Sequence, residues 1–130
     1  MIINDPGYDR AIFALGMALA QRALGFEVRL LFTYGAIVRL KRGRTDELGE
    51  ETNHWVIGEI RSGLQAGAVS RVSELLRDLK ELGGKIYACP AAMALHGIVS
   101  EDLVDEVDAV RGLVSFLTEE QGARARIVYI

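Results

Sequence analysis

Short apolar runs alternate along the chain with longer stretches in which apolar residues recur at helical spacing. The short runs cover residues 1–3, 27–32 and 85–88, and turn-forming residues bound them. The longer stretches cover residues 8–24 and 69–82 and end at Gly25 and at Gly83 and Gly84. Strands that alternate with helices form mainly parallel sheets with helical crossovers. The pattern therefore predicts an α/β domain.

Each predicted helix has an apolar face. In residues 8–24 the stripe consists of Ile12, Leu15, Leu19 and Ala23, with Phe13, Met17 and Leu24 on other sides of the helix. In residues 69–82 it consists of Val72, Leu75, Leu76, Leu79 and Leu82. Apolar residues on more than one side predict that the first helix packs on both the sheet and a neighbouring helix.

The last third predicts a short segment over residues 103–107, a helix over residues 110–120 and a final strand over residues 125–130. Together with the earlier runs this makes five short strands. The middle of the chain is harder to interpret. A basic cluster at Arg39, Lys41, Arg42 and Arg44 precedes an acidic stretch and a helix expected over residues 51–61. We expect the basic cluster to be a solvated face or to pair with carboxylates, the alternative being that it attracts an anionic sulfur compound or an acidic partner. We expect this part of the chain to be mobile or to face a partner.

Composition narrows the function classes. The chain has 130 residues, 50% of them hydrophobic and 25% charged, which predicts a single domain over residues 1–130. A formal net charge of -3 and a pI near 5.4 give no general attraction to nucleic acid or to anionic membranes. The apolar run over residues 11–20 is too short to span a bilayer. A lone cysteine and an amino terminus without signal-like features predict a cytoplasmic protein with a reduced thiol.

That single cysteine, Cys89, is the candidate for chemistry. It lies between the run at residues 85–88 and a helix predicted to begin at Pro90 and to end at Gly97. Backbone N–H groups at a helix start stabilise a thiolate and lower its pKa. The amides of Ala91 and Ala92 are expected to face the sulfur. The competing interpretation is that Cys89 is a buried, inert side chain, as many free cysteines are.

Other polar residues are weaker candidates. Asn4, Asp5, Gly7, Tyr34 and Gly35 follow the first two strands, where the carboxyl ends of a parallel sheet form a binding crevice. Asn4, Tyr34 and Gly35 are therefore expected to line the site. Turn chemistry explains several of them equally well, with Asp5 capping the first helix and Gly35 permitting a positive φ.

The two histidines are not expected to act on the thiol. His96 lies two helical turns after Cys89, about 10 Å away by the rise of a helix, and a capping or interface role is expected for it. His54 falls in the middle segment. One cysteine and two histidines have no metal-ligand spacing, and no phosphate-binding glycine motif occurs. We expect no bound metal and no cofactor.

The segment around Cys89 resembles the DsrE/DsrF sulfur-relay family, which includes the TusD-type proteins. The similar stretch runs from Lys85 through Cys89 to Ile98 and continues at residues 101–103 and at Gly112. Residues 9–15, 18–20, 25–28 and 31–35 are similar to the same family's first helix and second strand, with the poorest fit between residues 44 and 67.

The resemblance implies a flavodoxin-like three-layer α/β/α sandwich. It implies that Cys89 accepts sulfane sulfur as a persulfide and passes it to a partner thiol, as a sulfurtransferase-like carrier does. It also implies assembly, either as a homo-oligomer (a trimer or hexamer) or as a hetero-oligomer with related subunits, and it implies sulfur donor and acceptor proteins. Because the chain has one cysteine, the acceptor thiol must belong to another chain.

Two alternatives remain open at this point. One is a non-catalytic binding or scaffold subunit with a structural cysteine. The other is a thiol-dependent peroxidase, which the lack of a second cysteine and of an arginine next to Cys89 disfavours.

Overall fold

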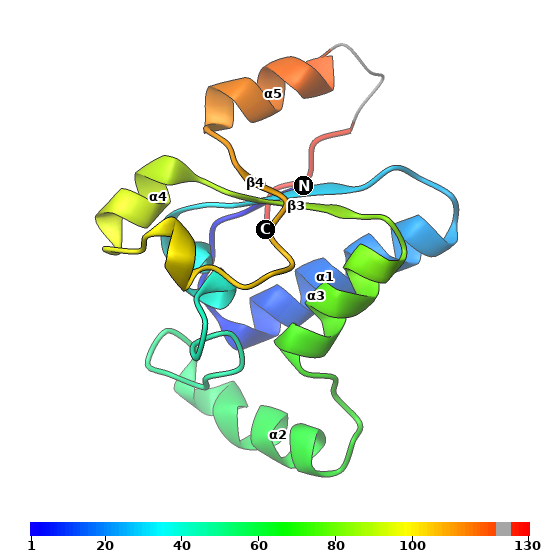
Figure 1. Ribbon diagram of the computed structural model, residues 1–130. Helices are drawn as coiled ribbons and strands as arrows, with labels where there is room; N and C mark the ends of the chain where they lie inside the picture. Colours follow the sequence, from blue (N-terminus) through cyan, green and yellow to red (C-terminus); the bar gives the residue numbers. More distant parts are fainter. Residues whose placement is uncertain (122–125) are drawn as a thin grey trace.

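Strands and helices alternate along most of the chain in the computed structural model, which describes residues 1–121 and 126–130 (Figure 1). Their order is β1 (Ile2–Ile3), α1 (Tyr8–Ala23), β2 (Arg29–Phe32), the 3-10 helix η1 (Tyr34–Leu40), α2 (His54–Gln65), α3 (Val72–Glu81), β3 (Lys85–Ala88), α4 (Pro90–Leu95), the 3-10 helix η2 (Ser100–Asp102), β4 (Ala109–Val110) and α5 (Leu113–Gln121). No helix within these residues has the length and apolar character needed to cross a membrane.

The strands form one parallel sheet in the order β1-β2-β3-β4. The chain moves in one direction across the sheet from β1 to β4, and right-handed crossovers then put the connecting helices on one face. Accordingly, α1 and α3 lie on the same side of the sheet (Figure 1). After β4 the chain turns back, so α5 covers the opposite face. This parallel sheet between two helical layers confirms the predicted fold class.

The sheet has four strands among the described residues, whereas the sequence predicted five. The expected fifth strand covered residues 125–130, of which residue 125 lies outside the described residues. The remainder runs beside β1, with backbone bonds from Ile2 N to Val128 O (2.7 Å), from Asn4 N to Ile130 O (2.7 Å) and from Ile130 N to Ile2 O (2.9 Å). It forms a single parallel bridge, between Ile2 and Tyr129, and is too short to count as a strand.

The fourth strand was predicted over residues 103–107 and is instead β4, at Ala109–Val110. The reason is that Leu103 and Val104 are used elsewhere. Leu103 forms an antiparallel bridge with Lys41, and the Val104 N–H donates to Leu40 O at 2.9 Å. Pairing with β3 begins only at Asp108, whose N–H donates to Ile86 O at 2.8 Å.

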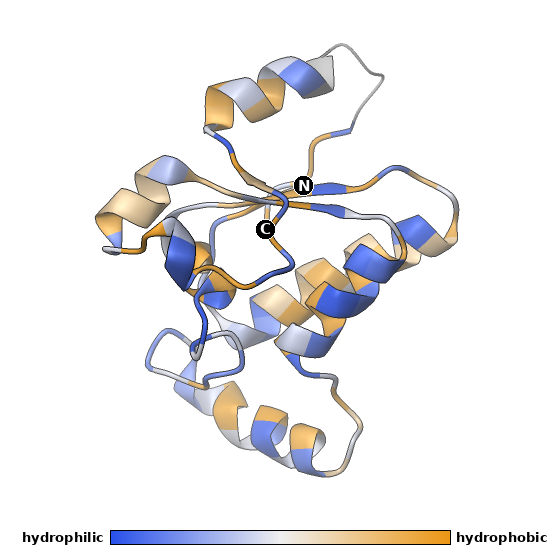
Figure 2. Ribbon diagram, in the orientation of Figure 1, coloured by the Kyte–Doolittle hydropathy of each residue, from blue (hydrophilic) through white to orange (hydrophobic). Residues whose placement is uncertain are grey.

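Helices α1 and α3 pack against each other. The residues of α1 that are buried are smaller than those of the predicted apolar stripe. The buried residues of α1 are Tyr8, Ala11, Ala14, Leu15 and Ala18, so only Leu15 of the predicted stripe is fully buried. Alanine side chains let two helices approach closely, whereas Ile12 and Leu19 are only partly buried. In α3, where apolar and polar residues alternate (Figure 2), Val72, Leu76 and Leu79 are buried but Leu82 is 46% exposed.

Arg42 and Arg44 of the basic cluster are exposed and pair with Asp105 and Glu47, as predicted for a solvated or salt-bridging face, but the side chain of Arg39 is fully buried. Its guanidinium donates to Pro6 O (2.9 Å), to Glu47 O (2.6 Å) and to the Glu51 carboxylate (2.6 Å). It also lies 5.3 Å from the ring of Tyr8. Burial lowers the pKa of Arg39, and Glu51 opposes that effect. Arg39 therefore ties η1 to the β1–α1 turn and to the loop that follows.

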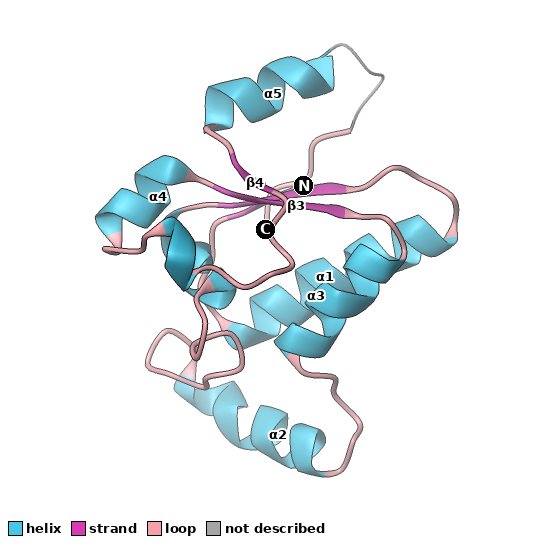
Figure 3. Cartoon of the chain, viewed as in Figure 1, coloured by secondary structure: helices cyan, strands magenta, loops and turns pink. Residues whose placement is uncertain are grey.

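That loop, residues 41–53, joins η1 to α2 (Figure 3) and anchors the start of α3. The Asp46 carboxylate accepts hydrogen bonds from the Ser73 N–H (2.9 Å) and hydroxyl (2.5 Å). Thr45 and Thr52 are buried. The helix expected over residues 51–61 is α2, shifted toward the carboxyl terminus.

Candidate functional site

Cys89 lies between the end of β3 and the start of α4. Its N–H donates to Phe32 O at 3.0 Å, which continues the β2–β3 pairing by one residue. Its carbonyl accepts the Met93 N–H at 3.0 Å, so Cys89 is also the N-cap of α4, and Pro90 occupies the first turn. Proline is well suited there because the N–H that it lacks would have no partner within the helix.

The side chain of Cys89 points to the face of the sheet that α5 covers. Side chains alternate between the two faces of a strand, so Tyr87 and Cys89 share a face. Tyr87 meets Phe116 of α5 edge to face, with ring centroids 6.0 Å apart. On β2, Leu31 pairs with Tyr87, and Thr33 follows two residues later on the same side. The site therefore lies between the carboxyl end of the sheet and the start of α5.

The thiol is buried, with 4% of the residue exposed, yet hydrogen-bond donors surround it. Burial raises the pKa of Cys89 because it removes water from the thiolate. The neighbouring Thr33 hydroxyl and the N–H groups of Ala92, Ala91 and Leu113 stabilise the thiolate and lower the pKa, and together they outweigh burial. The pKa of Cys89 therefore lies below its ordinary value, and the thiolate is more abundant near neutral pH than for a free cysteine.

Two of these donors were not foreseen from the sequence. Thr33 directly follows β2, just as Cys89 directly follows β3. Because Phe32 and Ala88 pair in register, Thr33 and Cys89 lie side by side, but this register is known only from the structure. Leu113 contributes only its backbone N–H, which every residue except proline has, so its residue type carries no signal. By contrast, Ala91 and Ala92 lie in the first turn of α4 as the sequence predicted, and their N–H groups lower the pKa of Cys89.

The expected site-lining residues lie at the carboxyl ends of β1 and β2. Tyr34 and Gly35 directly follow Thr33, and Tyr34 is 64% exposed. The positive φ expected at Gly35 occurs instead at Tyr34, where φ is 42°. Gly35 is required for another reason, since a Cβ there would lie 2.9 Å from Pro6 Cδ. Asn4 is exposed and connects through its backbone, with its carbonyl accepting the Ala36 N–H at 3.2 Å.

Asp5 shapes the turn before α1 and does not cap the helix. Its carboxylate accepts the Gly7 N–H at 2.8 Å, and Gly7 itself is the N-cap, without a side-chain hydrogen bond. His96 is the exposed C-cap residue of α4. His54 begins α2, which lies beyond α1 and α3 from the sheet (Figure 1). In residues 1–121 and 126–130, no three His, Cys, Asp or Glu side chains group closely enough to hold a metal ion.

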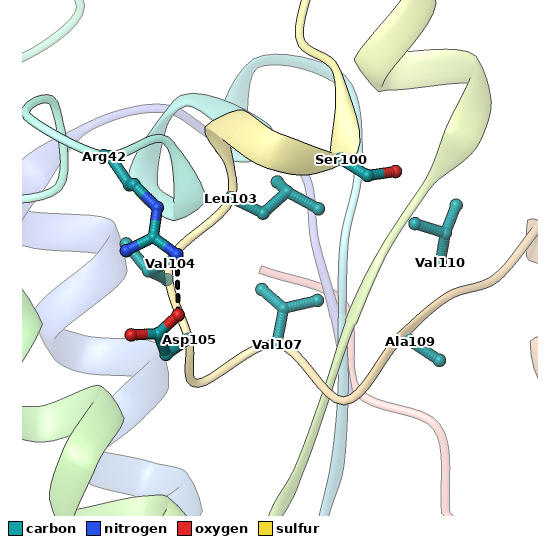
Figure 4. Close-up of a pocket in the computed structure, with 8 residues that line it drawn as sticks. All are labelled: Arg42, Ser100, Leu103, Val104, Asp105, Val107, Ala109 and Val110. Carbon is teal, nitrogen blue, oxygen red and sulfur yellow. Dashed lines mark hydrogen bonds and ion pairs between the residues drawn. The ribbon is translucent and has the colours of Figure 1, made fainter.

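A separate hollow of about 310 Å³ lies beside β4 (Figure 4). Its lining consists of Arg42, Ser100, Leu103, Val104, Asp105, Val107, Ala109 and Val110. The only charged residues of that lining are Arg42 and Asp105, which pair with each other at 2.6 Å. Neither the thiol nor a residue that donates to it belongs to this lining, so the hollow and Cys89 are distinct features.

The comparisons with known proteins bear on the family and on the fold. The sequence profile of the DsrE/DsrF-like family matches residues 1–124. The chain belongs to the DsrE/DsrF-like family. The match extends through the segment that the sequence resembled least, between residues 44 and 67. No curated protein sequence matches the chain at a significant level.

Two solved structures show how widely the fold is shared. The YchN protein from E. coli is similar over 99% of this chain and 96% of its own, with a TM-score of 0.69 and 17% identity. MTH1491 from Methanobacterium thermoautotrophicum, described as a protein of unknown function, is similar over 99% of this chain and 95% of its own, with a TM-score of 0.60 and 12% identity. At such identities the likeness concerns the fold alone, so function must be argued from the site.

Proposed function

We propose that this DsrE/DsrF-like protein is a sulfur carrier, in which Cys89 takes up sulfane sulfur as a persulfide and passes it to a partner thiol. The observation that carries the proposal is the set of four donors around a buried thiol. A merely packed cysteine needs no such donors. A nucleophilic thiolate does, because burial alone would keep the thiol protonated.

Sulfur uptake requires one displacement and no external oxidant. The Cys89 thiolate attacks the outer sulfur of a donor persulfide, and a new S–S bond forms on Cys89. The S–S bond of the donor breaks, and the donor leaves as a thiolate. The proton of the outer sulfur stays on the new persulfide or passes to the departing thiolate, depending on pH. This is thiol–disulfide exchange with a sulfur atom as the transferred group.

Delivery reverses the roles of the same groups. A partner thiolate attacks the outer sulfur of the Cys89 persulfide, the S–S bond breaks, and the Cys89 thiolate leaves. The donors from Thr33, Ala91, Ala92 and Leu113 stabilise negative charge on the Cys89 sulfur as it departs. A leaving thiolate of lower pKa departs faster, so the arrangement favours delivery as well as uptake.

The partner thiol must come from another chain, because the sequence contains one cysteine. Exposed apolar side chains occur close to the site in sequence and in the sheet, at Tyr34 (64% exposed), Val110 (42%), Leu113 (41%) and Val114 (79%). These support an assembly, either a homo-oligomer or a complex with related subunits, in which a neighbouring chain completes the pocket. A reducing compartment such as the cytoplasm fits a carrier that must keep its thiol free.

One observation favours a second candidate, a non-catalytic binding or scaffold subunit in which Cys89 is structural. That observation is the 4% exposure of Cys89, which limits the approach of a large partner. The two candidates differ in whether the native thiol reacts. An inert structural cysteine reacts with a thiol reagent only when the protein unfolds, whereas a carrier reacts in the native state.

The test is native mass spectrometry after incubation with a persulfide donor, followed by addition of an acceptor thiol. We expect added sulfur on the wild type, its loss to the acceptor, and no adduct on Cys89→Ser. Thr33→Ser serves as a matched control that keeps a hydroxyl beside the thiol and should retain loading. A wild-type protein that never gains sulfur, with Cys89 reacting only in denaturant, would establish the structural cysteine instead.

A further inference from the structure

Helix α5 is held on the sheet by the buried ring of Phe116, by the partly buried Leu117 and by the carboxylate of Glu119. Phe116 is 2% exposed and meets Tyr87 of β3 edge to face, at 6.0 Å and an interplanar angle of 69°. Glu119 pairs with Arg111, and also with Arg29 of β2 at 3.8 Å. The Arg111 guanidinium in turn lies 4.7 Å from the Tyr87 ring. These contacts set where α5 sits on the sheet.

The same helix begins at the thiol. Leu113 is its first residue and follows Arg111, whose N–H donates to Ala88 O at 2.9 Å, so the chain enters α5 beside Cys89. The Leu113 N–H there lowers the pKa of the thiol. Phe116 lies one turn later, and its own N–H donates to Gly112 O at 3.0 Å, which makes the first turn a rigid unit. The ring of Phe116 rests on Tyr87, two residues before Cys89 on the same strand. One side chain therefore holds the first turn of α5 over the segment that carries the thiol.

We propose that Phe116 is a positioning residue, which keeps the Leu113 N–H on the Cys89 sulfur and keeps the thiol covered. The proposal rests on the proposed function, since it assigns a role in preparing the thiol for sulfur transfer. Phe116 acts through Leu113 and need not touch the transferred sulfur itself.

Release of α5 from Tyr87 has two consequences with opposite effects on reactivity. The thiolate loses one of its donors, so the thiol becomes a weaker acid, and at the same time the sulfur becomes more accessible. A carrier with this arrangement keeps an acidic but shielded thiol while α5 is docked. Opening at the start of α5 then exposes the sulfur to a partner.

The segments next to Cys89 contain few charged residues that could also shift its pKa. Helix α4 contains no charged residue, and neither do residues 30–38 on the β2 and η1 side. On the α5 side the charges nearest in sequence to Leu113 and Phe116 are Arg111 and Glu119, which pair with each other, and Glu119 also pairs with Arg29. A change at Phe116 leaves this pair in place, which is why Phe116 is the position to vary.

The experiment follows the thiolate by its ultraviolet absorbance during a pH titration, with Cys89→Ser as the blank. This measurement needs no reagent to reach the sulfur. In Phe116→Ala we expect the titration midpoint of Cys89 to rise by about one pH unit, the size expected for losing one of several hydrogen bonds to a charged group. In Phe116→Leu, which keeps apolar volume without the ring, the rise should be smaller. Phe13→Ala, at a 55% exposed position of α1 on the other face, is the matched control and should titrate as the wild type does.

Amide hydrogen exchange at Leu113 supplies a second readout, which should accelerate in both Phe116 variants. If Phe116→Ala does not fold, the titration and exchange of Phe116→Leu decide the question. An unchanged midpoint with unchanged exchange overturns the proposal, as does an equal shift in Phe13→Ala. Failure of the wild type to load sulfur would defeat the proposed function instead, because the titration involves no sulfur donor.

Discussion

The Thr33 hydroxyl lies beside Cys89 at the ends of two neighbouring strands and lowers the pKa of its thiol. The two residues directly follow Phe32 and Ala88, which pair in register, so parallel strands of matched length bring them side by side. Thr33 is 6% exposed, and the Cys89 N–H bonds to the carbonyl that precedes Thr33. The side-chain donor of the site is thus positioned by the sheet itself and does not depend on a mobile loop.

Replacing Thr33 with valine keeps the shape of the side chain and removes its hydroxyl. The charged thiolate loses a donor while burial is unchanged, so the pKa of Cys89 should rise, by about one unit. A pH titration of thiolate absorbance measures the change. Thr118→Val is a matched control, because the Thr118 hydroxyl donates to Val114 O within α5. A Thr33→Val midpoint equal to that of the wild type would exclude the hydroxyl from the site.

Removing the carboxylate of Glu51 should strongly destabilise the fold. Arg39 is fully buried and pairs with Glu51, so Glu51→Ala leaves a buried cation without its counter-charge. We expect a loss of about 3 kcal/mol in the free energy of unfolding, measured by urea denaturation. The neighbouring Glu50 is exposed, and Glu50→Ala should cost little. Equal effects of the two substitutions would contradict the role of Arg39 as an internal clamp.

A methyl group should be tolerated very differently at two glycines. In Gly35→Ala the new Cβ would lie 2.9 Å from Pro6 Cδ and 3.0 Å from Pro6 Cγ. The proline ring is stiff, so the β1–α1 turn must shift, and we expect a loss of about 1 to 3 kcal/mol. Nothing lies within 4 Å of a Cβ at Gly58 in α2, and Gly58→Ala should stabilise the protein by about 0.5 to 1 kcal/mol. Thermal unfolding of the two variants should therefore move in opposite directions.

The contribution of Asp108 to the free energy of unfolding should vanish in acid. Burial raises the pKa of Asp108, but hydrogen bonds from Lys80, from the Ile86 N–H and from Lys85 lower it below its usual value. A lowered folded-state pKa means that the stabilisation is fully present above the unfolded pKa of about 3.9 and is lost as pH falls through the folded value. Asp108→Asn should therefore cost about 1 to 2 kcal/mol at neutral pH and almost nothing at the acid end.

Urea denaturation at a series of pH values measures that dependence. The control is Asp105→Asn, because the Asp105 side chain is 87% exposed and pairs with the exposed Arg42. Its effect should be small at every pH. A cost of Asp108→Asn that persists unchanged in strong acid would show that the carboxylate's charge is not what stabilises this corner of the sheet.

Local features of the fold follow closely from the sequence. The strand over residues 85–88 is β3 without a shift, and α1 begins at Tyr8 as predicted. Gly25 and Gly83 end their helices with φ of 86° and 81°, which other residues rarely adopt. These features depend on backbone preferences and on hydrophobic spacing within a few residues, which a sequence expresses directly.

Non-local features were predicted less well. The burial of Ala11 and Ala14, the shift of the fourth strand to Ala109 and the burial of Arg39 were all missed. Each depends on a partner far away in the sequence. The small face of α1 is covered because α3 approaches it closely, and a buried arginine has the same residue type as an exposed one.

The candidate site likewise has features that follow from nearby residues in the sequence and features that depend on distant ones. The place of Cys89 at a strand end and a helix start, with the Ala91 and Ala92 amides ahead of it, is local and can be derived from the order of residues. The approach of Thr33 depends on strand register, and that of the Leu113 N–H depends on how Phe116 docks α5 against Tyr87. A backbone N–H is the same in almost every residue, so it becomes a specific feature only when packing of distant segments brings it to the thiol.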